Sequence, residues 1–503
     1  MTLAELLSGR DVRVLGGTTQ TITGLSYDSR GTQPGDFFFA TARDLRSAQA
    51  HVEQALSRGA RAAAVRNWDR EAHSTATIIE CPQLRALMGV VAARFFGGPS
   101  RALDLIGVTG TSGKTTTTYL LRSILEAAGR PAAIIGTVGI FVGERKLSSG
   151  LTTPEAIDLE GVLAAMRRDG VSTVAAEISS IGLEERRVDE LNFRACVFTN
   201  LGRDHLDYHG TLEKYFAAKL RLFEELLPRS IHSNAIAAVN GDDPYGQRVL
   251  DATHGGKISF GLGAKLEARA ISARVGANGI EATLVIRGKR FKVRSPLLGE
   301  INLRNILGAS AVSVALGIET DAVVEGVRRC PGAPGRLEHV SGPPGVTVLV
   351  DYAHKPDALA AVLGALRALE PRRLICVFGC GGDRDRGKRP LMGEIAGRLA
   401  DVPIVTSDNP RTEEPQRIID EIEAGMRTTA LERIDPQRAR TASGYLIEPD
   451  RRAAIALGLR VAAPGDFLLI AGKGHEDYQL IGGRRLDFDD RVVVHEETAA
   501  LGA

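Results

Sequence analysis

Apolar runs and amphipathic stretches alternate along the 503-residue chain, and the clearest pair flanks a glycine-rich loop. Residues 103–108 are typical of a buried strand, and helical apolar spacing continues after the loop to Leu125. The loop, GTSGKT, is a compact variant of the eight-residue phosphate-loop pattern. Its glycines would let backbone N–H groups close around phosphate oxygens at the start of a helix. Lys114 would neutralise the β- and γ-phosphates, and the Thr115 hydroxyl would bind Mg²⁺. The alternative is a strand-to-helix turn with an incidental lysine.

The same alternation predicts an α/β protein of three domains. Residues 1–98 form a small α/β domain, in which FFFA and RAAAV are strands and residues 50–59 are a helix. A linker is expected at residues 97–100. Residues 99–331 form a central domain with the parallel sheet of a P-loop ATPase. Residues 332–503 form a doubly wound, Rossmann-like domain.

Within the central domain, residues 132–140, 171–179 and the segment ACVFTN are predicted strands. Pro154 is expected in the first turn of a helix that runs toward Arg168. Residues 257–298 alternate apolar and polar positions with glycines, which predicts an antiparallel β insertion. Helices around residues 302–316 and 321–329 close this domain.

Composition narrows the class of protein. The net charge of +2 does not favour nucleic acid or an anionic membrane as a partner. No apolar run approaches the length of a membrane span, and the N-terminus lacks the pattern of a signal peptide. The five scattered cysteines include no second pair that would complete a zinc site with Cys376 and Cys380. We therefore expect free thiols in the cytoplasm and, as the oligomeric state, a monomer.

Two polar side chains follow strands of the central domain. Glu177 and His205 would lie at the edge of the sheet where ligands gather in open α/β folds. Both could bind the metal, and Glu177 is the stronger candidate because Mg²⁺ prefers oxygen. His205 could instead pack within its loop. Lys219 lies on a predicted helix with an apolar face, where the residue pattern alone indicates a solvated lysine.

The last domain carries three charged clusters, each at the end of a predicted strand. They are residues 383–389 beside a Gly-Cys-Gly-Gly turn, residues 408–411 (DNPR) and residues 472–476 (GKGHE). Together they would suit a zwitterionic ligand, with arginine meeting a carboxylate and glutamate meeting an ammonium group. The alternative is three surface turns that share an edge, since ligand sites are more often apolar.

As a set, these motifs resemble the Mur ligase family over residues 24–494. The resemblance is closest to the branch that adds meso-2,6-diaminopimelate to UDP-N-acetylmuramoyl-L-alanyl-D-glutamate. It is carried by DSR (28–30), PGD (34–36), GTSGKTT (110–116), LTTPE (151–155), EISS (177–180), RDHLDYHG (203–210), AAK (217–219), PGRLE (334–338), DYAHKPD (351–357), GCGGDRDRGKRP (379–390), DNPR (408–411) and GKGHEDYQ (472–479). Within this family DNPR marks diaminopimelate rather than lysine.

The resemblance implies an ATP- and Mg²⁺-dependent, amide-bond-forming ligase of peptidoglycan precursor synthesis, a process tied to cell shape and division. Residues 1–98 would bind the uridine end, residues 99–331 ATP, and residues 332–503 the incoming amino acid. A substrate carboxylate would attack the γ-phosphate, and the amine of diaminopimelate would then attack the acyl phosphate. Closure of the third domain over the second would bring the reacting groups together.

The resemblance also assigns residues to each ligand. The ATP phosphates and adenosine would be held by Gly110, Thr111, Ser112, Gly113, Lys114, Thr115, Thr116, Asn305, Arg336 and Asp351. The UDP-muramoyl-dipeptide would be held by Ser29, Thr152, Thr153, Ser179 and Arg187. Diaminopimelate would be held by Arg384, Asp408, Asn409, Pro410, Arg411, Gly472 and Glu476. The catalytic residues would be Lys114, Glu177, His205 and Lys219. The metal ligands would be Thr115, Glu177, His205 and Lys219, the last as a carbamate.

Several positions depart from the family pattern. Ser112 replaces asparagine, Arg43 and residues 47–49 replace a G…DGH stretch, and Lys355 replaces threonine. Ile181 replaces histidine, and Glu185 replaces the glutamine expected two residues before Arg187. These changes bear on recognition of the uridine and the muramoyl-peptide.

Two classes of rival function remain. One is a related amide ligase with another acceptor, such as a folylpolyglutamate synthetase or a Mur ligase that adds lysine; DNPR and the full first domain argue against both. The other is a P-loop ATPase or nucleotide switch. Dependence of ATP turnover on both co-substrates would separate a ligase from a switch.

Overall fold

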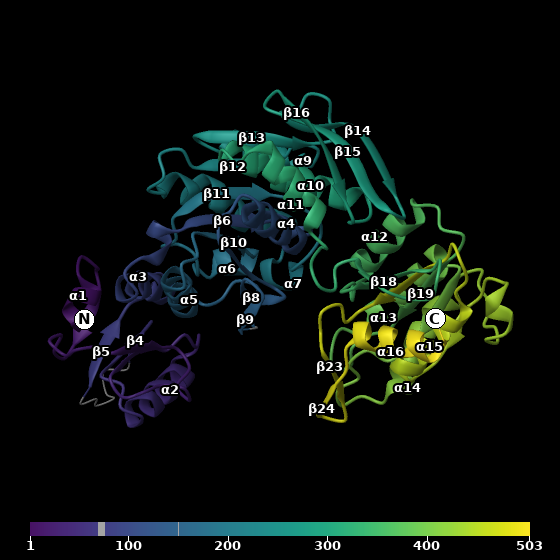
Figure 1. Cartoon of the computed structure of the whole chain (residues 1–503). Coiled ribbons are helices and arrows are strands. Elements are labelled where there is room, and N and C mark those ends of the chain that lie inside the picture. The colour runs from purple at the N-terminus through teal and green to yellow at the C-terminus, as the bar shows by residue number, and fades with distance from the viewer. Residues whose placement is uncertain (69–75, 149, 503) are drawn as a thin grey trace. The chain divides into compact units, whose positions relative to one another are not determined.

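The computed structural model describes residues 1–68, 76–148 and 150–502. The chain forms two compact units. Unit one comprises Met1–Ala268 and Gly308–Val323, and unit two comprises Arg269–Leu307 and Val324–Ala503. Each unit has its own buried apolar clusters and mostly parallel sheets, which confirms the predicted α/β class. Figure 1 shows the elements along the chain. The domain borders at residues 98 and 331 stay a prediction.

The first sheet of unit one has the order β1-β5-β4-β3-β2. Its strands are β1 (Arg13–Leu15), β2 (Gly24–Ser26), β3 (Asp36–Phe39), β4 (Ala62–Val65) and β5 (Thr77–Glu80). Its helices are α1 (Leu3–Leu7), α2 (Leu45–Ser57) and α3 (Leu84–Phe95). Helix α2 begins five residues before the predicted start at residue 50, because the Asp44 side chain caps it by accepting the Ser47 N–H. The expected linker overlaps a 3₁₀ turn, Pro99–Ala102, in which Pro99 and Ser100 are buried.

The second sheet of unit one runs in the order β13-β12-β11-β6-β10-β7-β8-β9. Its strands are β6 (Asp104–Thr109), β7 (Ala132–Gly136), β8 (Gly139–Val142), β9 (Arg145–Ser148), β10 (Thr173–Glu177), β11 (Phe193–Phe198), β12 (Ile236–Asn240) and β13 (Gly256–Gly261). Its helices are α4 (Lys114–Ala127), α5 (Ala156–Arg168), α6 (Ser180–Glu184), α7 (Leu206–His209), α8 (Leu212–Arg221) and α9 (Pro244–Ala252). The ladder from β13 to β7 is parallel, so the carboxyl ends of β6, β10 and β11 share one edge.

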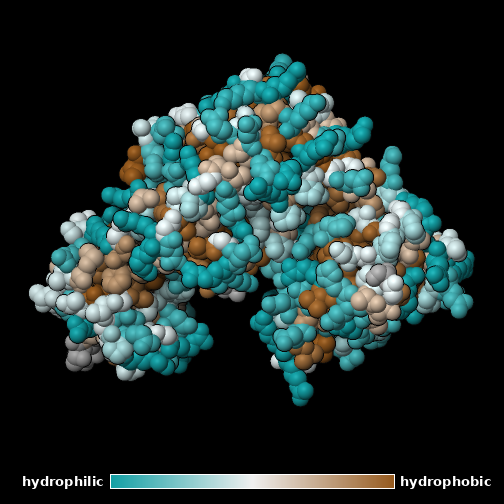
Figure 2. All heavy atoms as spheres, viewed as in Figure 1, coloured by the Kyte–Doolittle hydropathy of each residue, from teal (hydrophilic) through white to brown (hydrophobic). Residues whose placement is uncertain are grey.

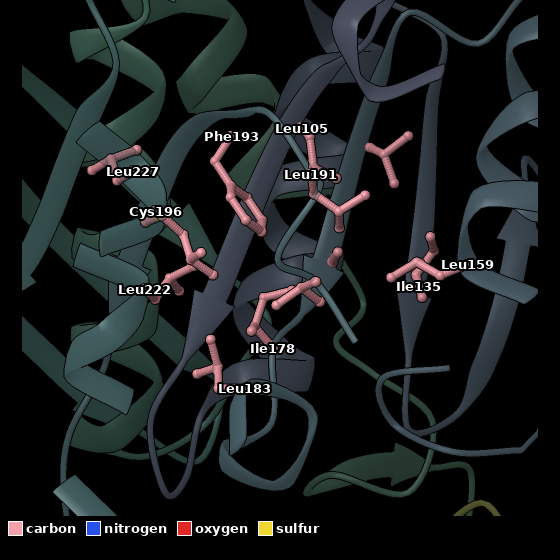
Figure 3. Packing of buried hydrophobic residues seen from close by; sticks show 14 of the residues in the cluster. Leu105, Ile135, Leu159, Ile178, Leu183, Leu191, Phe193, Cys196, Leu222 and Leu227 are labelled. Atoms are coloured by element: carbon pink, nitrogen blue, oxygen red, sulfur yellow. The ribbon is translucent and has the colours of Figure 1, made fainter. Parts of the chain in front are cut away.

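Buried apolar side chains fix the register at the centre of this sheet. Figure 3 shows Phe193 of β11 beside Leu105, its register partner on β6. A Cβ atom at Gly107 would lie 2.9 Å from the Phe193 ring, closer than packed atoms allow. Gly107 is therefore required for strand packing, whereas the phosphate loop begins after Thr109.

Two expected elements of unit one differ in the structure. Residues 132–140, predicted as one strand, form an antiparallel hairpin of β7 and β8. Gly139, with φ of 145°, allows the chain to reverse within an apolar run that gives little sign of a turn. Pro154, predicted in the first helical turn, precedes the N-cap residue Glu155 of α5.

Unit two contains a sheet with the order β17-β18-β22-β19-β20-β21. Its strands are β17 (Glu338–Val340), β18 (Thr347–Asp351), β19 (Leu374–Phe378), β20 (Val402–Val405), β21 (Leu446–Ile447) and β22 (Phe467–Ala471). Its helices are α12 (Pro356–Arg367), α13 (Lys388–Leu399), α14 (Pro415–Met426), α15 (Arg451–Val461) and α16 (Asp490–Ala500). All neighbours except β17 and β18 pair in parallel, as expected of a doubly wound sheet.

The remaining elements include the predicted β insertion. It consists of β14 (Ala268–Gly276), β15 (Gly279–Ile286) and β16 (Lys289–Ser295), of which β15 and β16 form an antiparallel hairpin. The helices α10 (Glu300–Ala315) and α11 (Thr320–Arg329) contain residues of both units. A second hairpin, β23 (Tyr478–Ile481) with β24 (Arg484–Asp487), follows β22.

Surface and cysteine placement agree with the composition. Among the described residues no helix is long and apolar enough to cross a membrane. Polar and apolar residues are intermixed on the face seen in Figure 2. All five cysteines are buried free thiols, with Cys81 and Cys196 in unit one and the other three in unit two.

Glu160 of α5 is a buried carboxyl group with a pH-dependent effect on stability. It is 2% exposed, and its Oε2 atom has no hydrogen-bond partner among the described residues. Burial and, secondarily, the charge of Glu190 raise its pKa to about 8. The unfolded chain loses this proton near pH 4.5, so the folded state loses stability as the pH rises from there through 8.

We therefore expect Glu160→Gln to unfold with the same free energy as the parent below about pH 4.5. Above about pH 8 the variant should be more stable by up to about 5 kcal/mol, since the pKa shift from 4.5 to about 8 spans about 3.5 units and each unit is worth about 1.4 kcal/mol. Urea unfolding at several pH values measures this difference. Exposed Glu224→Gln is the control and should show no such gap; a constant difference at all pH values would contradict the prediction.

Candidate functional site

The phosphate loop lies between β6 and α4, and two glycines shape it. Gly110 has φ of 148° and Gly113, the N-cap residue of α4, has φ of 84°, both in the region that favours glycine. A Cβ atom at Gly110 would lie 1.9 Å from Thr199 Oγ1. The loop thus leads into the amino end of a 14-residue helix, whose unpaired N–H groups suit an anion.

Thr199 and Asn200, which follow β11, brace this loop. Asn200 Oδ1 accepts the Ser112 N–H at 3.0 Å, and Asn200 Nδ2 donates to the Ser112 carbonyl at 3.1 Å. Thr199 Oγ1 donates to the same carbonyl at 2.7 Å. Sequence reasoning missed both residues. Their signal was a polar pair directly after an apolar strand that neighbours the loop strand.

Lys114 and Lys219 meet at one backbone carbonyl. Each Nζ donates to the Gly110 oxygen at 2.8 Å, and Lys114 also donates to the Thr111 oxygen at 2.9 Å. Lys219 is 1% exposed and lies over the Tyr215 ring, with Nζ 4.6 Å from the centroid. Burial and repulsion from Lys114 lower the pKa of Lys219 well below its usual range, with Asp204 opposing. Lys219 is therefore a buried amine whose charged form is disfavoured, and the expectation of a solvated lysine was wrong.

Glu177 ends β10 at the same sheet edge. Its Oε1 accepts the Thr137 N–H at 2.9 Å and its Oε2 accepts the Thr137 hydroxyl at 3.1 Å. A Cβ atom at Gly136 would lie 2.2 Å from Oε1, so this carboxylate fits only beside glycine. Glu177 is 1% exposed, so it is a buried acidic group whose two oxygens both accept hydrogen bonds from Thr137.

The other predicted metal ligands lie on nearby elements. Thr115 is buried in the first turn of α4, next to Thr116. His205 is the N-cap residue of α7 with φ of 52°, and its Nε2 lies 3.5 Å from Asp204 Oδ2. Within residues 1–68, 76–148 and 150–502, no group of three or more His, Cys, Asp or Glu side chains could hold a metal. A cation here would depend on the Thr115 hydroxyl, Glu177 and a modified Lys219, which together would supply oxygen donors.

The residues predicted for the muramoyl-peptide form one hydrogen-bonded group around Thr153. Its hydroxyl donates to the Glu177 carbonyl at 2.9 Å and accepts the Ser179 N–H at 2.9 Å. Arg187 Nη1 donates to the Thr153 carbonyl at 3.0 Å. Thr152 Oγ1 lies 3.0 Å from Thr137 Oγ1. This group therefore adjoins the carboxylate of Glu177.

Two departures from the family pattern contact each other. Arg43 Nη2 lies 3.2 Å from Glu185 Oε1, which also accepts the Tyr208 hydroxyl at 2.6 Å. Arg85 forms a further ion pair with Glu185. Burial alone would raise the pKa of Glu185, but these donors outweigh burial and lower the pKa. The negative charge of this additional carboxylate is therefore balanced by the two arginines. Ser29, predicted for uridine, is 5% exposed and donates to Gln54 Oε1 at 2.6 Å.

A cavity of about 330 Å³ lies beside this ion-pair group. It is lined by Arg66, Pro82, Gln83, Leu84, Arg85, Ala86, Glu184, Glu185 and Arg186. These residues come from the segment after β4, the start of α3 and the end of α6.

The residues predicted near adenosine belong to unit two. Asn305 Nδ2 donates to Asn302 Oδ1 at 3.0 Å, and both side chains are buried in α10. Asp351 accepts the Leu337 and Ala353 N–H groups at 2.8 Å, and burial raises its pKa against the attraction of Arg336. The Arg336 guanidinium lies 5.1 Å from the Tyr352 ring centroid.

The structure of unit two brings the three charged clusters together at the carboxyl ends of β19, β20 and β22. Asn409 Nδ2 donates to Glu476 Oε2 at 2.9 Å, which joins the DNPR loop to the GKGHE loop. Arg411 Nη1 donates to the Gly382 carbonyl at 2.6 Å, which joins DNPR to the turn that precedes Arg384. Arg411 has φ of 54°, a left-handed conformation uncommon for arginine.

Buried charges and one orphaned acceptor characterise this group. Lys473 is fully buried, with Nζ 3.2 Å from Asn409 Oδ1 and 3.4 Å from Glu476 Oε2. Burial raises the pKa of Glu476, although Lys473 opposes the shift. Asp408 Oδ1 is buried and accepts no hydrogen bond from the described residues, with Lys473 Nζ 3.8 Å away. An acceptor of this kind suits the ammonium group of a ligand.

The remaining predicted residues of this group differ in exposure. Gly472 has φ of 118° and, like Pro410, is buried, whereas Arg384 is exposed. Arg389, which sequence reasoning did not select, is fully buried beneath the loops. It donates to Glu413 at 2.8 Å, to Glu421 at 2.8 Å and to the Gly381 carbonyl at 3.3 Å.

The chain is similar to known proteins over nearly its full length. A Mur ligase middle domain model matches residues 108–313, and a Mur ligase, glutamate ligase domain model matches residues 335–474. The chain is similar to the UDP-N-acetylmuramoyl-L-alanyl-D-glutamate–2,6-diaminopimelate ligase of Geobacter metallireducens, with 44% identity over 96% of this chain and 95% of that protein. The enzyme of the same name from Synechococcus elongatus is 42% identical, over 98% and 97% of the two chains. A solved structure with that name is 33% identical, with a TM-score of 0.71 over 100% of this chain and 99% of the other.

Proposed function

The chain belongs to the Mur ligase family of ATP-dependent, amide-bond-forming ligases, and from this premise we propose its substrates. It joins meso-2,6-diaminopimelate to UDP-N-acetylmuramoyl-L-alanyl-D-glutamate in the cytoplasmic synthesis of peptidoglycan precursors. The observation that carries the proposal is the convergence of DNPR with the GKGHE loop and the turn before Arg384, beside the orphaned Asp408 Oδ1. Near-full-length similarity to relatives with this activity supports it.

The first half of the reaction uses the phosphate loop. A carboxylate of the D-glutamyl residue attacks the γ-phosphorus of ATP, ADP leaves, and an acyl phosphate forms. Backbone N–H groups of residues 110–116 and the Lys114 ammonium group stabilise the charge that develops on the transferred group. The muramoyl-peptide is held by the group around Thr153, including Ser179 and Arg187.

Mg²⁺ fits the oxygen donors near this loop. When bound, it would offset negative charge on the phosphates. Thr115 and Glu177 would hold it, with His205 nearby. Lys219 would contribute as a carbamate, formed when its neutral amine attacks CO₂ and loses a proton. The burial of Lys219 supports this because only an unprotonated amine can react.

The second half uses the loops of unit two. The amine of diaminopimelate attacks the acyl carbon, phosphate leaves, and the amine loses a proton. Arg411 and Arg384 bind a carboxylate of the amino acid, while Asp408, Asn409 and Glu476 bind its distal ammonium group. Gly472 and Pro410 shape the backbone around it.

Phosphate release tests the proposal directly. The assay contains ATP, Mg²⁺ and the UDP-muramoyl-dipeptide, with meso-diaminopimelate or L-lysine in parallel. Release only with diaminopimelate is expected. Release with lysine instead would still be consistent with a ligase, but it would overturn diaminopimelate as the acceptor. Release that needs neither co-substrate would indicate an ATPase.

Modification of Lys219 makes a separate prediction. Removing CO₂ from the protein and buffers should lower the ligase activity, and bicarbonate should restore it, because a carbamate forms reversibly from the neutral amine. Activity is measured by phosphate release before and after bicarbonate is added. An ATP-hydrolysing enzyme that carries no carbamate, assayed by phosphate release in the same buffers, controls for pH drift. Two results together would contradict the prediction: activity that does not depend on CO₂, and mass spectrometry that finds no carbamate on Lys219.

A further inference from the structure

Arg451 and Asp490 form a completely buried ion pair in unit two. Both side chains are 0% exposed. Arg451 Nε donates to Asp490 Oδ1 at 2.8 Å, and Nη2 donates to Oδ2 at 2.7 Å. The two residues are the first residues of α15 and α16, respectively. The fork therefore holds the Arg451 guanidinium in one orientation at the carboxyl edge of the sheet.

The same guanidinium contacts the strands that deliver the acceptor loops. Nη2 donates to the Ala471 carbonyl at 3.1 Å, and Nη1 lies 3.4 Å from the Ser407 carbonyl it donates to. Ser407 directly precedes the DNPR loop, and Ala471 directly precedes the GKGHE loop. Strand β19 lies between β20 and β22, so these two strand ends do not pair with each other. One side chain thus ties together two loops that the sheet itself keeps apart.

We propose that Arg451, oriented by Asp490, is a positioning residue for the amino-acid acceptor site. The inference rests on the proposed function of these loops. Arg451 does not touch the acceptor; it fixes the spacing between the backbone before Asp408 and the backbone before Gly472. Asn409 and Glu476, which contact each other at 2.9 Å, then keep the separation that a bound ammonium group requires. A small displacement of either loop would weaken binding of the amino acid without affecting the phosphate loop.

A second ion pair, beside the start of β22, supplies a matched control. Arg373 Nη2 donates to Asp466 Oδ2 at 2.7 Å, and Asp466 is 0% exposed. Arg373 also donates to two carbonyls, those of Ala439 and Val461. Asp466 directly precedes β22, whereas Ala471 ends it. The control pair therefore lies at the end of β22 opposite the acceptor loops. Asp466 is also bound by Arg372, whose side chain is half exposed.

The experiment compares full-length enzymes in which each pair is replaced by apolar residues. Arg451→Met with Asp490→Leu removes both charges and leaves no unpaired buried ion, and Arg373→Met with Asp466→Leu does the same at the other end. We expect the first variant to raise the KM for meso-diaminopimelate about ten- to a hundredfold, with the KM for ATP and for the UDP-muramoyl-dipeptide unchanged. The control should leave every KM unchanged, whatever its effect on Tm. Arg451→Lys, which keeps the charge and loses the fork, should raise the same KM to a smaller extent.

The outcomes separate this proposal from the proposed function. A parent enzyme that does not use diaminopimelate would overturn the function. A parent enzyme that does, with an unchanged KM in both Arg451 variants, would overturn the positioning role alone. Equal KM changes in the control variant would also overturn it, because a merely structural pair would then produce the effect. If the double variant does not fold, Arg451→Lys decides.

Discussion

Replacing Lys114 by alanine should lower kcat for phosphate release about 10²- to 10³-fold, the loss typical of removing one group that stabilises transition-state charge. The two carbonyls that Lys114 contacts hold its ammonium group over the loop, 2.8 Å and 2.9 Å from their oxygens. No other residue of the loop segment 110–116 carries a charge. The backbone N–H groups would remain, so binding of ATP should weaken less than turnover.

The measurement is steady-state phosphate release with all three substrates, together with ATP binding by calorimetry. Lys214→Ala is the control, because Lys214 is an exposed lysine of α8, the same helix that carries Lys219. It should keep parent activity. If kcat falls by less than a few-fold in a folded Lys114→Ala enzyme, Lys114 does not act in the reaction.

Replacing Arg411 by alanine should lower kcat/KM for meso-diaminopimelate about 10- to 100-fold, as expected when a charged hydrogen bond to a ligand carboxylate is lost. The KM for ATP should not change. The left-handed backbone of Arg411 and the 2.6 Å bond to Gly382 aim the side chain toward the neighbouring turn. Arg411→Lys should recover part of the loss because it keeps the charge but not the planar fork.

Initial rates at varied diaminopimelate, with ATP and the UDP-muramoyl-dipeptide saturating, measure this effect. Arg417→Ala, on the exposed face of α14 six residues further on, is the control for removing a positive charge from this region. Kinetics in which Arg411→Ala loses affinity for ATP rather than for diaminopimelate would contradict the assignment.

Continuous apolar runs with polar ends made much of this fold predictable. The runs that became β6, β19, β20 and β22 are short and, apart from Asp104, wholly buried, so few other structures could accommodate them. Their carboxyl ends necessarily carry the loops in which the candidate residues lie, which is why the three clusters of unit two could be expected at one edge. The family resemblance then gave these residues roles, which stay predictions.

The parts that could not be predicted depend on contacts between distant residues. The hairpin of β7 and β8 was missed because both strands are apolar, and only Gly139 marks the reversal. The burial of Lys219 depends on α8 packing against the phosphate loop, which the helix's own sequence does not reveal. The burial of Arg389 and Arg451 could not be predicted either, because the sequence does not show which arginines pair with carboxylates in the interior.

The distribution of the five thiols gives each unit an internal reporter. Cys196 lies in β11 of unit one and Cys376 lies in β19 of unit two, and both are 0% exposed. A thiol reagent can reach either sulfur only when the surrounding strand opens. Labelling of the unmodified enzyme, read out by peptide mass, therefore follows the opening of the two units separately within one sample. A ligand that binds only one unit would slow the labelling of that unit's cysteine, so the same chemistry could show which substrate stabilises which half of the enzyme.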